Sequence, residues 1–334
     1  MERRKITMLG KYSYIITLPK EWINMHDISR GDSVSVRIEG NGALTVTPQL
    51  DTIEKSLEKT IPIGVNEDPN TIVRSVIGCY LNGINIIHIV SSKNFTPEQQ
   101  NAIRNVVRSL YMRILESTSS KVTLQTFMDE SLASVESGIE RMHIITGSMF
   151  KDVLTALSEW DENLAKSVLT LEEDVDQFMF FLMRLLRISI SHPSLASKLN
   201  LTMTDCFDYH LLINRIEYIA DHLSDISLVV INLKNVSEQI PETIITHLVK
   251  LAEDTYRYYE IAVDSFFTGN LDQVNEIIDA KDAQGSIEEM FEPFQVLNEQ
   301  DKTIIWQLYS INDNLSRIRK FTADIAEITI DRSL

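Results

Sequence analysis

The strongest constraint on the fold is a helical pattern that begins near Ser131 and continues toward the C-terminus. In two stretches the apolar residues alternate spacings of four and three, which puts them on one face of an α-helix and predicts packing in a bundle. The first stretch comprises Leu164, Val168, Leu171, Val175, Phe178, Leu182 and Leu185. The second comprises Leu212, Ile216, Ile219, Leu223, Ile226, Val230 and Leu233.

Breaks in this pattern divide the region into six helices. They fall near Trp160-Asp161, His192-Pro193, residues 236–241, Thr268-Gly269 and Glu299-Gln300. Long helices joined by short loops run antiparallel to their neighbours, so we expect two three-helix bundles, at residues 129–236 and 237–334. The second half also echoes the first, which indicates an internal duplication. Val168, Leu171 and Asp176 recur in order as Val274, Ile277 and Asp282, and Ala220-Asp221 recurs as Ala323-Asp324.

Residues 1–50 have the alternating pattern of β-hairpins. Between Lys5 and Trp22 the apolar residues of one parity share a face of two short strands, namely Ile6, Met8, Tyr14, Ile16 and Leu18. A second hairpin is predicted around Asn41-Gly42, a dipeptide typical of tight hairpin turns. Four strands in so few residues cannot bury a core alone. We therefore expect the segment to pack on the rest of the chain or, our preference, to form a homodimer.

The charge distribution suggests where a polyanion would bind. The net charge of the 334-residue chain is −17, yet residues 1–50 carry seven Lys and Arg against five Asp and Glu. Because the rest of the chain repels a polyanion, only this terminus can attract one. Four cations crowd the exposed side of the first hairpin, and we predict that they contact DNA: Arg3, Arg4, Lys5 and Lys11.

The segment Lys11-Tyr-Ser-Tyr-Ile-Ile-Thr-Leu-Pro-Lys-Glu-Trp22, followed by Ile28-Ser-Arg-Gly-Asp32, resembles the SpoVT/AbrB-like swapped-hairpin family. The resemblance covers residues 3–48. It implies that two copies interleave into one dimeric barrel and grip DNA with basic residues of the N-terminal strands. The alternative is a small barrel that serves only for dimerisation.

Residues 51–128 read as a small α/β unit without a catalytic or phosphate-binding motif. The predicted elements are a strand at 58–63, a helix at 71–81, a strand at 84–90, a helix from the capping box Thr96–Gln99 to about Glu116, and a strand at 121–127. We expect this unit to act as a spacer or an interface.

Four carboxylates stand out in the first helical half. Glu172 and Asp176 are one helical turn apart beside the apolar stripe, and Glu217 and Asp221 repeat this arrangement on the next helix. Like charges at this spacing destabilise a helix unless a cation lies among them, and oxygen ligands suit hard divalent cations. The alternative is an ordinary solvated acidic face.

The signatures Ala165-x-x-Val168-x-x-x-Glu172-x-x-x-Asp176 and Ile216-Glu217-x-Ile219-Ala220-Asp221 resemble the paired helix motifs of the PhoU family. The resemblance covers residues 131–330. It implies tandem three-helix bundles that regulate phosphate uptake, with a divalent metal ion on the four carboxylates of the first repeat. In the second repeat the first acid of each pair is replaced, by Ile278 and by Lys320, which puts a second metal site in doubt.

The predicted fold class is therefore multidomain: an all-β swapped-hairpin barrel, an α/β middle unit and all-α tandem bundles. Two cysteines, Cys79 and Cys206, are too few for a disulfide scaffold. No apolar run approaches the roughly twenty residues that span a bilayer. We expect a cytoplasmic protein without direct membrane insertion.

The leading functional hypothesis is a DNA-binding transcriptional regulator of phosphate homeostasis, not an enzyme. One alternative is an adaptor that dimerises through its N-terminus and docks on a phosphate transporter or a signalling protein. A bundle metalloenzyme is a weaker reading, because the histidines do not provide the paired Glu-x-x-His motifs of di-iron carboxylate bundles. The seven histidines are at positions 26, 88, 143, 192, 210, 222 and 247.

Overall fold

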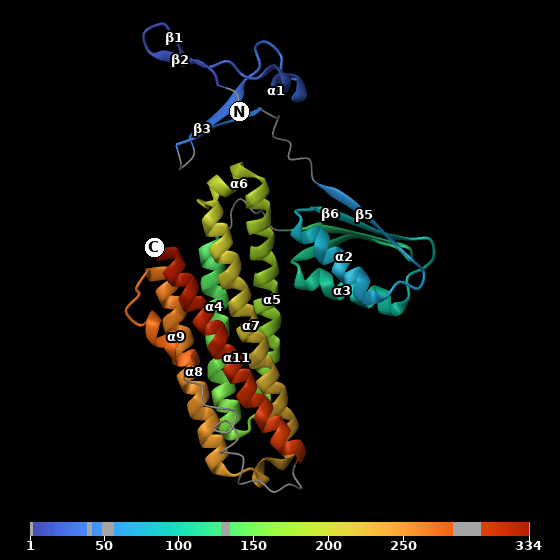
Figure 1. Ribbon diagram of the computed structural model, residues 1–334. Coiled ribbons are helices and arrows are strands. Elements are labelled where there is room, and N and C mark those ends of the chain that lie inside the picture. The colour runs from blue at the N-terminus through green and yellow to red at the C-terminus, as the bar shows by residue number, and fades with distance from the viewer. Residues whose placement is uncertain (1–2, 39–41, 49–56, 128–133, 283–301, 334) are drawn as a thin grey trace. The chain divides into compact units, whose positions relative to one another are not determined.

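The computed structural model describes residues 3–38, 42–48, 57–127, 134–282 and 302–333 (Figure 1). Its contacts divide the chain into two compact units, Met1–Ser56 and Leu57–Leu334. The larger unit contains an α/β part and a bundle of long helices, each with a hydrophobic core of its own. The predicted boundary between residues 50 and 51 lies outside the described residues.

The N-terminal unit consists of two antiparallel hairpins and a short helix. Its elements are β1 (Thr7–Leu9), β2 (Ser13–Ile15), α1 (Lys20–Met25), β3 (Val34–Ile38) and β4 (Leu44–Pro48). Met8 pairs with Tyr14, and Val36 pairs with Val46, so the apolar residues of each hairpin share a face as predicted. Gly42 has a φ of +79°, which favours glycine in the second turn.

Within the described residues of this unit, no side chain is buried. The exposed fractions are 68% for Tyr14, 60% for Val36, 78% for Ile38 and 65% for Leu44. These values are those of solvated side chains, although the residues alternate like those of a buried sheet face. A single copy of the hairpins therefore has no core that could stabilise it.

The α/β part is a four-stranded sheet with two helices on one face (Figure 1). Its elements are β5 (Glu58–Ile63), α2 (Pro69–Leu81), β6 (Ile86–Ser91), α3 (Pro97–Ser109), β7 (Met112–Ser117) and β8 (Lys121–Thr126). The strand order is β5-β6-β8-β7, and only the β5–β6 pair is parallel.

The prediction of a helix to about Glu116 was wrong. The capping box of Thr96 and Gln99 is present, but the helix ends at Ser109. Tyr111 then adopts a positive φ of 49°, which turns the chain out of the helix. Residues 112–117 instead form β7, which pairs with β8, so the sheet has four strands where we expected three.

The bundle contains the long helices that the periodicity predicts. Its elements are α4 (Val135–Glu159), α5 (Glu162–Ser191), α6 (Pro193–Lys198), α7 (Met203–Leu233), the 3₁₀ helix η2 (Lys234–Gln239), α8 (Glu242–Thr268), α9 (Val274–Asp282) and α11 (Lys302–Ser333). Trp160 adopts a left-handed φ of 54°, and Asp161 caps α5, which confirms the first predicted break. The break predicted at 299–300 lies outside the described residues.

One hydrophobic core runs through both halves of the bundle. All seven stripe residues of α7 are buried, and α7 packs against α5 on one side and α11 on the other. Helices α4 and α8 form a second contact between the halves. The two predicted three-helix sets thus pack on each other and share one hydrophobic core. Among the described residues, no helix has the length and apolar content needed to cross a membrane.

A buried arginine fastens the α/β part to the bundle. The Arg184 side chain on α5 is fully buried, donates hydrogen bonds to the backbone carbonyls of Tyr80 and Ile84, and lies 4.8 Å over the Tyr80 ring. Arg187, about one helical turn further along α5, donates a hydrogen bond to the Oδ1 atom of Asn82 at 2.9 Å. These charge-assisted hydrogen bonds tie the end of α2 and the loop that follows it to α5.

Candidate functional site

The structure brings three of the four predicted carboxylates together. Glu172 and Asp176 come from α5, and Asp221 comes from α7. One oxygen atom from each lies within 4.8 Å of the other two. The Glu172 and Asp176 side chains are half-buried, and Asp221 offers the most exposed oxygen atom of the three.

Helix geometry explains this convergence. Residues four apart lie on the same face of a helix, so the i, i+4 acids of α5 and of α7 each form a short row. The two helices pack through the buried stripes beside these rows, with Val168 and Val175 on α5 and Ile219 and Leu223 on α7. Hydrophobic packing of these stripes holds the two rows next to each other.

Burial and the neighbouring like charges raise the pKa values of the clustered carboxyl groups. Desolvation, followed by the charges of Asp176 and Asp221, raises the pKa of Glu172 to about 7. Desolvation and the charge of Asp221 raise the pKa of Asp176 to about 6. Glu172 and Asp221 also share a hydrogen bond, which favours the protonated form of Glu172.

Glu217 lies beside this trio rather than within it. Its side chain is half-buried, and desolvation, followed by the charges of Asp221, Asp176 and Glu172, raises its pKa to about 8. All four predicted residues are thus electrostatically coupled. Three of them present converging oxygen atoms, and Glu217 lies outside that group of three.

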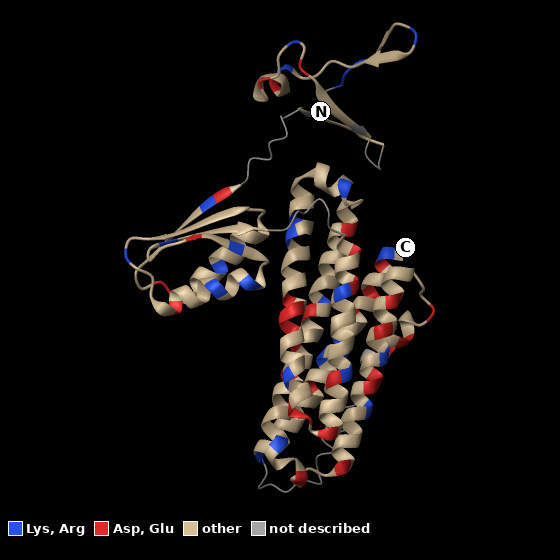
Figure 2. Cartoon of the chain, turned by 180° about the vertical axis from the view of Figure 1, so that it is seen from behind, with Lys and Arg blue, Asp and Glu red and all other residues tan. Residues whose placement is uncertain are grey.

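The donor set fits a hard divalent cation. Carboxylate oxygens are the ligands that Mg²⁺ and Mn²⁺ prefer, and a bound cation would replace the protons that the raised pKa values imply. It would also link α5 to α7 across the row of acids. Figure 2 shows that Asp and Glu are spread along the helices, but the cluster differs from those exposed acids in its burial and convergence.

The corresponding place in the second half is occupied differently. Ile278 packs against the hydrophobic core, and the Asp324 carboxylate is 2.7 Å from the Arg215 guanidinium of α7. Lys320, which replaces the first acid of the other pair, is exposed. The side chain of Asp282 lies outside the described part of the chain. Sequence reasoning missed Arg215, because no local pattern indicates that it faces another helix.

The predicted DNA-contacting residues surround the first hairpin. Arg3, Lys5 and Lys11 are exposed, and Lys11 lies in the turn between β1 and β2. Arg4 is half-buried and donates a hydrogen bond to the Thr17 Oγ1 atom at 3.0 Å. Arg4 therefore helps to hold the ends of the hairpin, while the other three cations are available to a ligand.

Comparisons with known proteins agree with both resemblances. Residues 139–230 match the family model of the PhoU domain, and residues 10–53 match that of the antidote-toxin recognition MazE bacterial antitoxins. No curated protein matches the chain. The fold is similar to that of PhoU from Pseudomonas aeruginosa, with a TM-score of 0.50, 15% identity, and coverage of 59% of this chain and 93% of that one.

A further similar structure is the phosphate transport system regulatory protein PhoU from Streptococcus pneumoniae, with a TM-score of 0.45, 15% identity, and coverage of 59% of this chain and 91% of that one. The class defined by the fold is a helical-bundle protein with an α/β part and a small β-rich N-terminal unit. The chain carries a PhoU domain on its C-terminal side and a MazE/AbrB-like domain at its N-terminus. The matched PhoU segment includes all four carboxylates of the cluster.

Proposed function

We propose that this protein is a cytoplasmic, DNA-binding transcriptional regulator of phosphate uptake. In this proposal the N-terminal hairpins read DNA as a homodimer, and the PhoU-like bundle acts as the sensor. The pairing of the two domain types in one chain carries the proposal. We propose no catalytic role.

Exposed apolar faces and exposed cations in the N-terminal unit support the reader role. A second copy would cover the solvated faces around Val36 and Ile38, which a single copy leaves open. Arg3, Lys5 and Lys11 would then be repeated by symmetry, and phosphate contacts from such cations dominate non-specific DNA affinity. The net charge of −17 would oppose binding anywhere else.

The carboxylate cluster supports the sensor role. A divalent ion on Glu172, Asp176 and Asp221, with Glu217 beside them, would make the α5–α7 contact depend on the metal. A phosphate transporter or a signalling protein is the second partner that we propose for the bundle. An adaptor that never touches DNA remains the alternative, with the hairpins used only for dimerisation.

Sequencing of DNA that co-purifies with crosslinked full-length protein tests the proposal. Enrichment upstream of phosphate-transport genes supports it, and uniform coverage favours the adaptor. The contacts are tested by replacing Lys5 or Lys11 with alanine and measuring DNA affinity at several salt concentrations. Each lost phosphate contact should lower the slope of log K against log salt by roughly one unit and weaken all sequences alike.

Lys93→Ala is the matched control, because Lys93 is an equally exposed lysine in the α/β part. The control should leave both affinity and slope unchanged. Equal DNA binding by the Lys5→Ala, Lys11→Ala double variant and the control would contradict the placement of the DNA contact in the first hairpin.

A further inference from the structure

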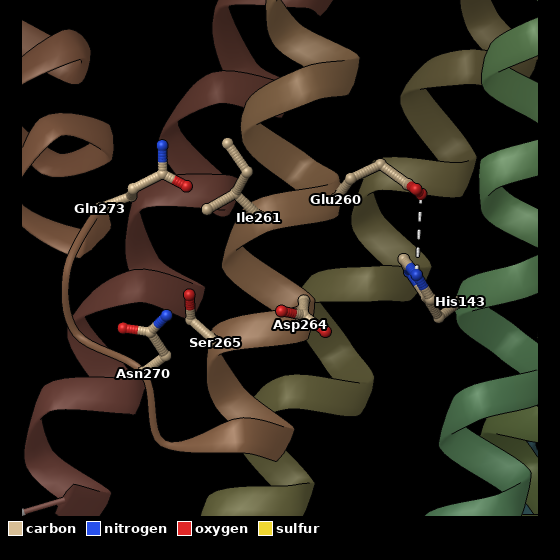
Figure 3. Close-up of a pocket in the computed structure, with 7 residues that line it drawn as sticks. All are labelled: His143, Glu260, Ile261, Asp264, Ser265, Asn270 and Gln273. Atoms are coloured by element: carbon tan, nitrogen blue, oxygen red, sulfur yellow. Dashed lines mark ion pairs between the residues drawn. The ribbon is translucent and has the colours of Figure 1, made fainter.

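A second group of metal-ligating side chains lines a cavity of about 340 Å³ beside α8. Figure 3 shows His143 of α4 directed toward Glu260 of α8, with Asp264 on the next turn of the same helix. Asn270 and Gln273, which follow α8, also line the cavity. The carboxylate cluster described above lies on α5 and α7, so these residues form a separate group.

The spacing of His143 and Glu260 suits two ligands of one ion. The Nε2 atom of His143 is 3.6 Å from the Oε1 atom of Glu260, which is longer than a direct hydrogen bond. Nitrogen and oxygen ligands lie about 2.0–2.2 Å from a divalent metal, so neighbouring ligand atoms in one shell are roughly 3–3.5 Å apart. The pair therefore needs little adjustment to share an ion.

The surroundings of the two helices favour this arrangement. Gly147 lies one turn beyond His143, and a Cβ atom there would be 3.3 Å from the Oε1 atom of Glu260. The bare helix surface thus lets the carboxylate lie close to α4. The Nδ1 atom of His143 is buried and has no hydrogen-bond partner among the described residues, so the ring makes its polar contact through Nε2.

The negative charge of the residues that line the cavity favours a cation as the ligand. Two carboxylates and one imidazole line the cavity, and the Nζ atom of Lys151 lies over the Tyr256 ring, 5.8 Å from its centroid. The Tyr256 hydroxyl is the other titratable group that contacts Glu260. An excess of negative charge remains beside the cavity, and a mixed nitrogen and oxygen donor set suits borderline metals better than Mg²⁺ or Ca²⁺.

We propose that His143, Glu260 and Asp264 bind a borderline divalent cation, such as Zn²⁺, Co²⁺, Fe²⁺ or Mn²⁺. Asp264 reaches the ion by a change of side-chain rotamer, and water or the amide oxygens of Asn270 and Gln273 complete the coordination. The ion joins α4 to α8, the first helices of the two halves of the bundle. This site does not depend on the proposed function.

Cobalt binding to the full-length protein tests the site. Co²⁺ is added to a Glu172→Gln, Glu217→Gln protein, in which the first cluster is weakened, and binding is measured by equilibrium dialysis and visible absorption. We expect about one tightly held Co²⁺ per chain, displaced by Zn²⁺. Adding His143→Gln or Asp264→Asn should weaken binding at least about tenfold, because the loss of a partner that only orients a ligand already costs roughly that much.

His247→Gln is the matched control, because His247 lies on α8 but does not line the cavity. Asp264 is exposed, so Asp264→Asn tests the site even where His143→Gln impairs folding. The proposal is overturned if the Glu172→Gln, Glu217→Gln protein retains no Co²⁺. It is also overturned if Asp264→Asn retains Co²⁺ with unchanged affinity and absorption.

Discussion

The Arg215 guanidinium of α7 lies 2.7 Å from the Asp324 carboxylate of α11, and both side chains are 27% exposed. A cation from the first half of the bundle thus neutralises the acid that aligns with Asp221 in the second half. The pair also joins the two halves at their α7–α11 contact. The Asp324 carboxylate is therefore already paired with a cation of the protein itself.

Replacing Asp324 should leave the metal response intact and lower stability. Asp324→Asn leaves the Arg215 charge partly unpaired, with an expected cost of about 1 kcal/mol, measured by urea unfolding. Asp313→Asn is the control on the same helix, because Asp313 pairs with Arg317 in a more exposed place and should cost only a few tenths of a kcal/mol. Loss of metal-induced stabilisation in Asp324→Asn would show that the second half does bind metal.

Metal should stabilise the protein through the first cluster. A ligand that binds only the folded state at a hundred times its dissociation constant contributes about 2.7 kcal/mol. Chelation should therefore lower the melting temperature, and Glu172→Gln with Glu217→Gln should abolish the Mg²⁺ response. Glu173→Gln with Asp225→Asn removes the same charge from exposed neighbours and should preserve the response. If the purified wild-type protein holds no metal and its melting temperature does not change when metal is added, the cluster is an ordinary acidic surface.

The metal-free protein should lose stability as the pH rises from about 5 to 8. The folded-state pKa values of Asp176, Glu172 and Glu217, about 6, 7 and 8, lie above those of the unfolded chain. As the pH rises, the unfolded chain therefore loses these protons at a lower pH than the folded protein does. Between the two sets of pKa values the folded protein binds more protons, so the free energy of unfolding falls. Thermal unfolding in chelator across this range should show a steeper decline for wild type than for Glu172→Gln, Glu217→Gln. Parallel curves would contradict the raised pKa values.

A charge on the apolar face of the N-terminal hairpins should abolish the proposed dimer. Val36 faces the same side as Val46, and Val36→Asp would bury an unpaired carboxylate in the dimer at a cost of several kcal/mol. Ser35→Asp places the same charge on the opposite face and is the control. Analytical ultracentrifugation should show loss of the dimer in the first variant only, with the thermal transition of the bundle retained. A DNA-competent Val36→Asp dimer would contradict the interleaved-hairpin hypothesis.

Local patterns predicted the elements whose signals lie within one segment. The stripes of α5 and α7, the capping box at Thr96 and the alternating hairpins each depend on neighbours a few residues apart. The end of α3 was mispredicted because the residues after Ser109 fit a helix about as well as a strand. Pairing with β8, which is distant in sequence, decided that they form β7.

The sequence by itself determined which helix faces carry acid, since the spacing of Glu172 and Asp176 fixes their common face. Only the tertiary structure decided which acidic side chains lie next to one another and which lie next to a basic side chain. Packing of α5 on α7 brought Asp221 to Glu172, packing of α11 on α7 brought Arg215 to Asp324, and packing of α4 on α8 brought His143 to Glu260. The physical reason is that burial of the apolar stripes sets how the helices pack, and the polar side chains take whatever neighbours that packing provides.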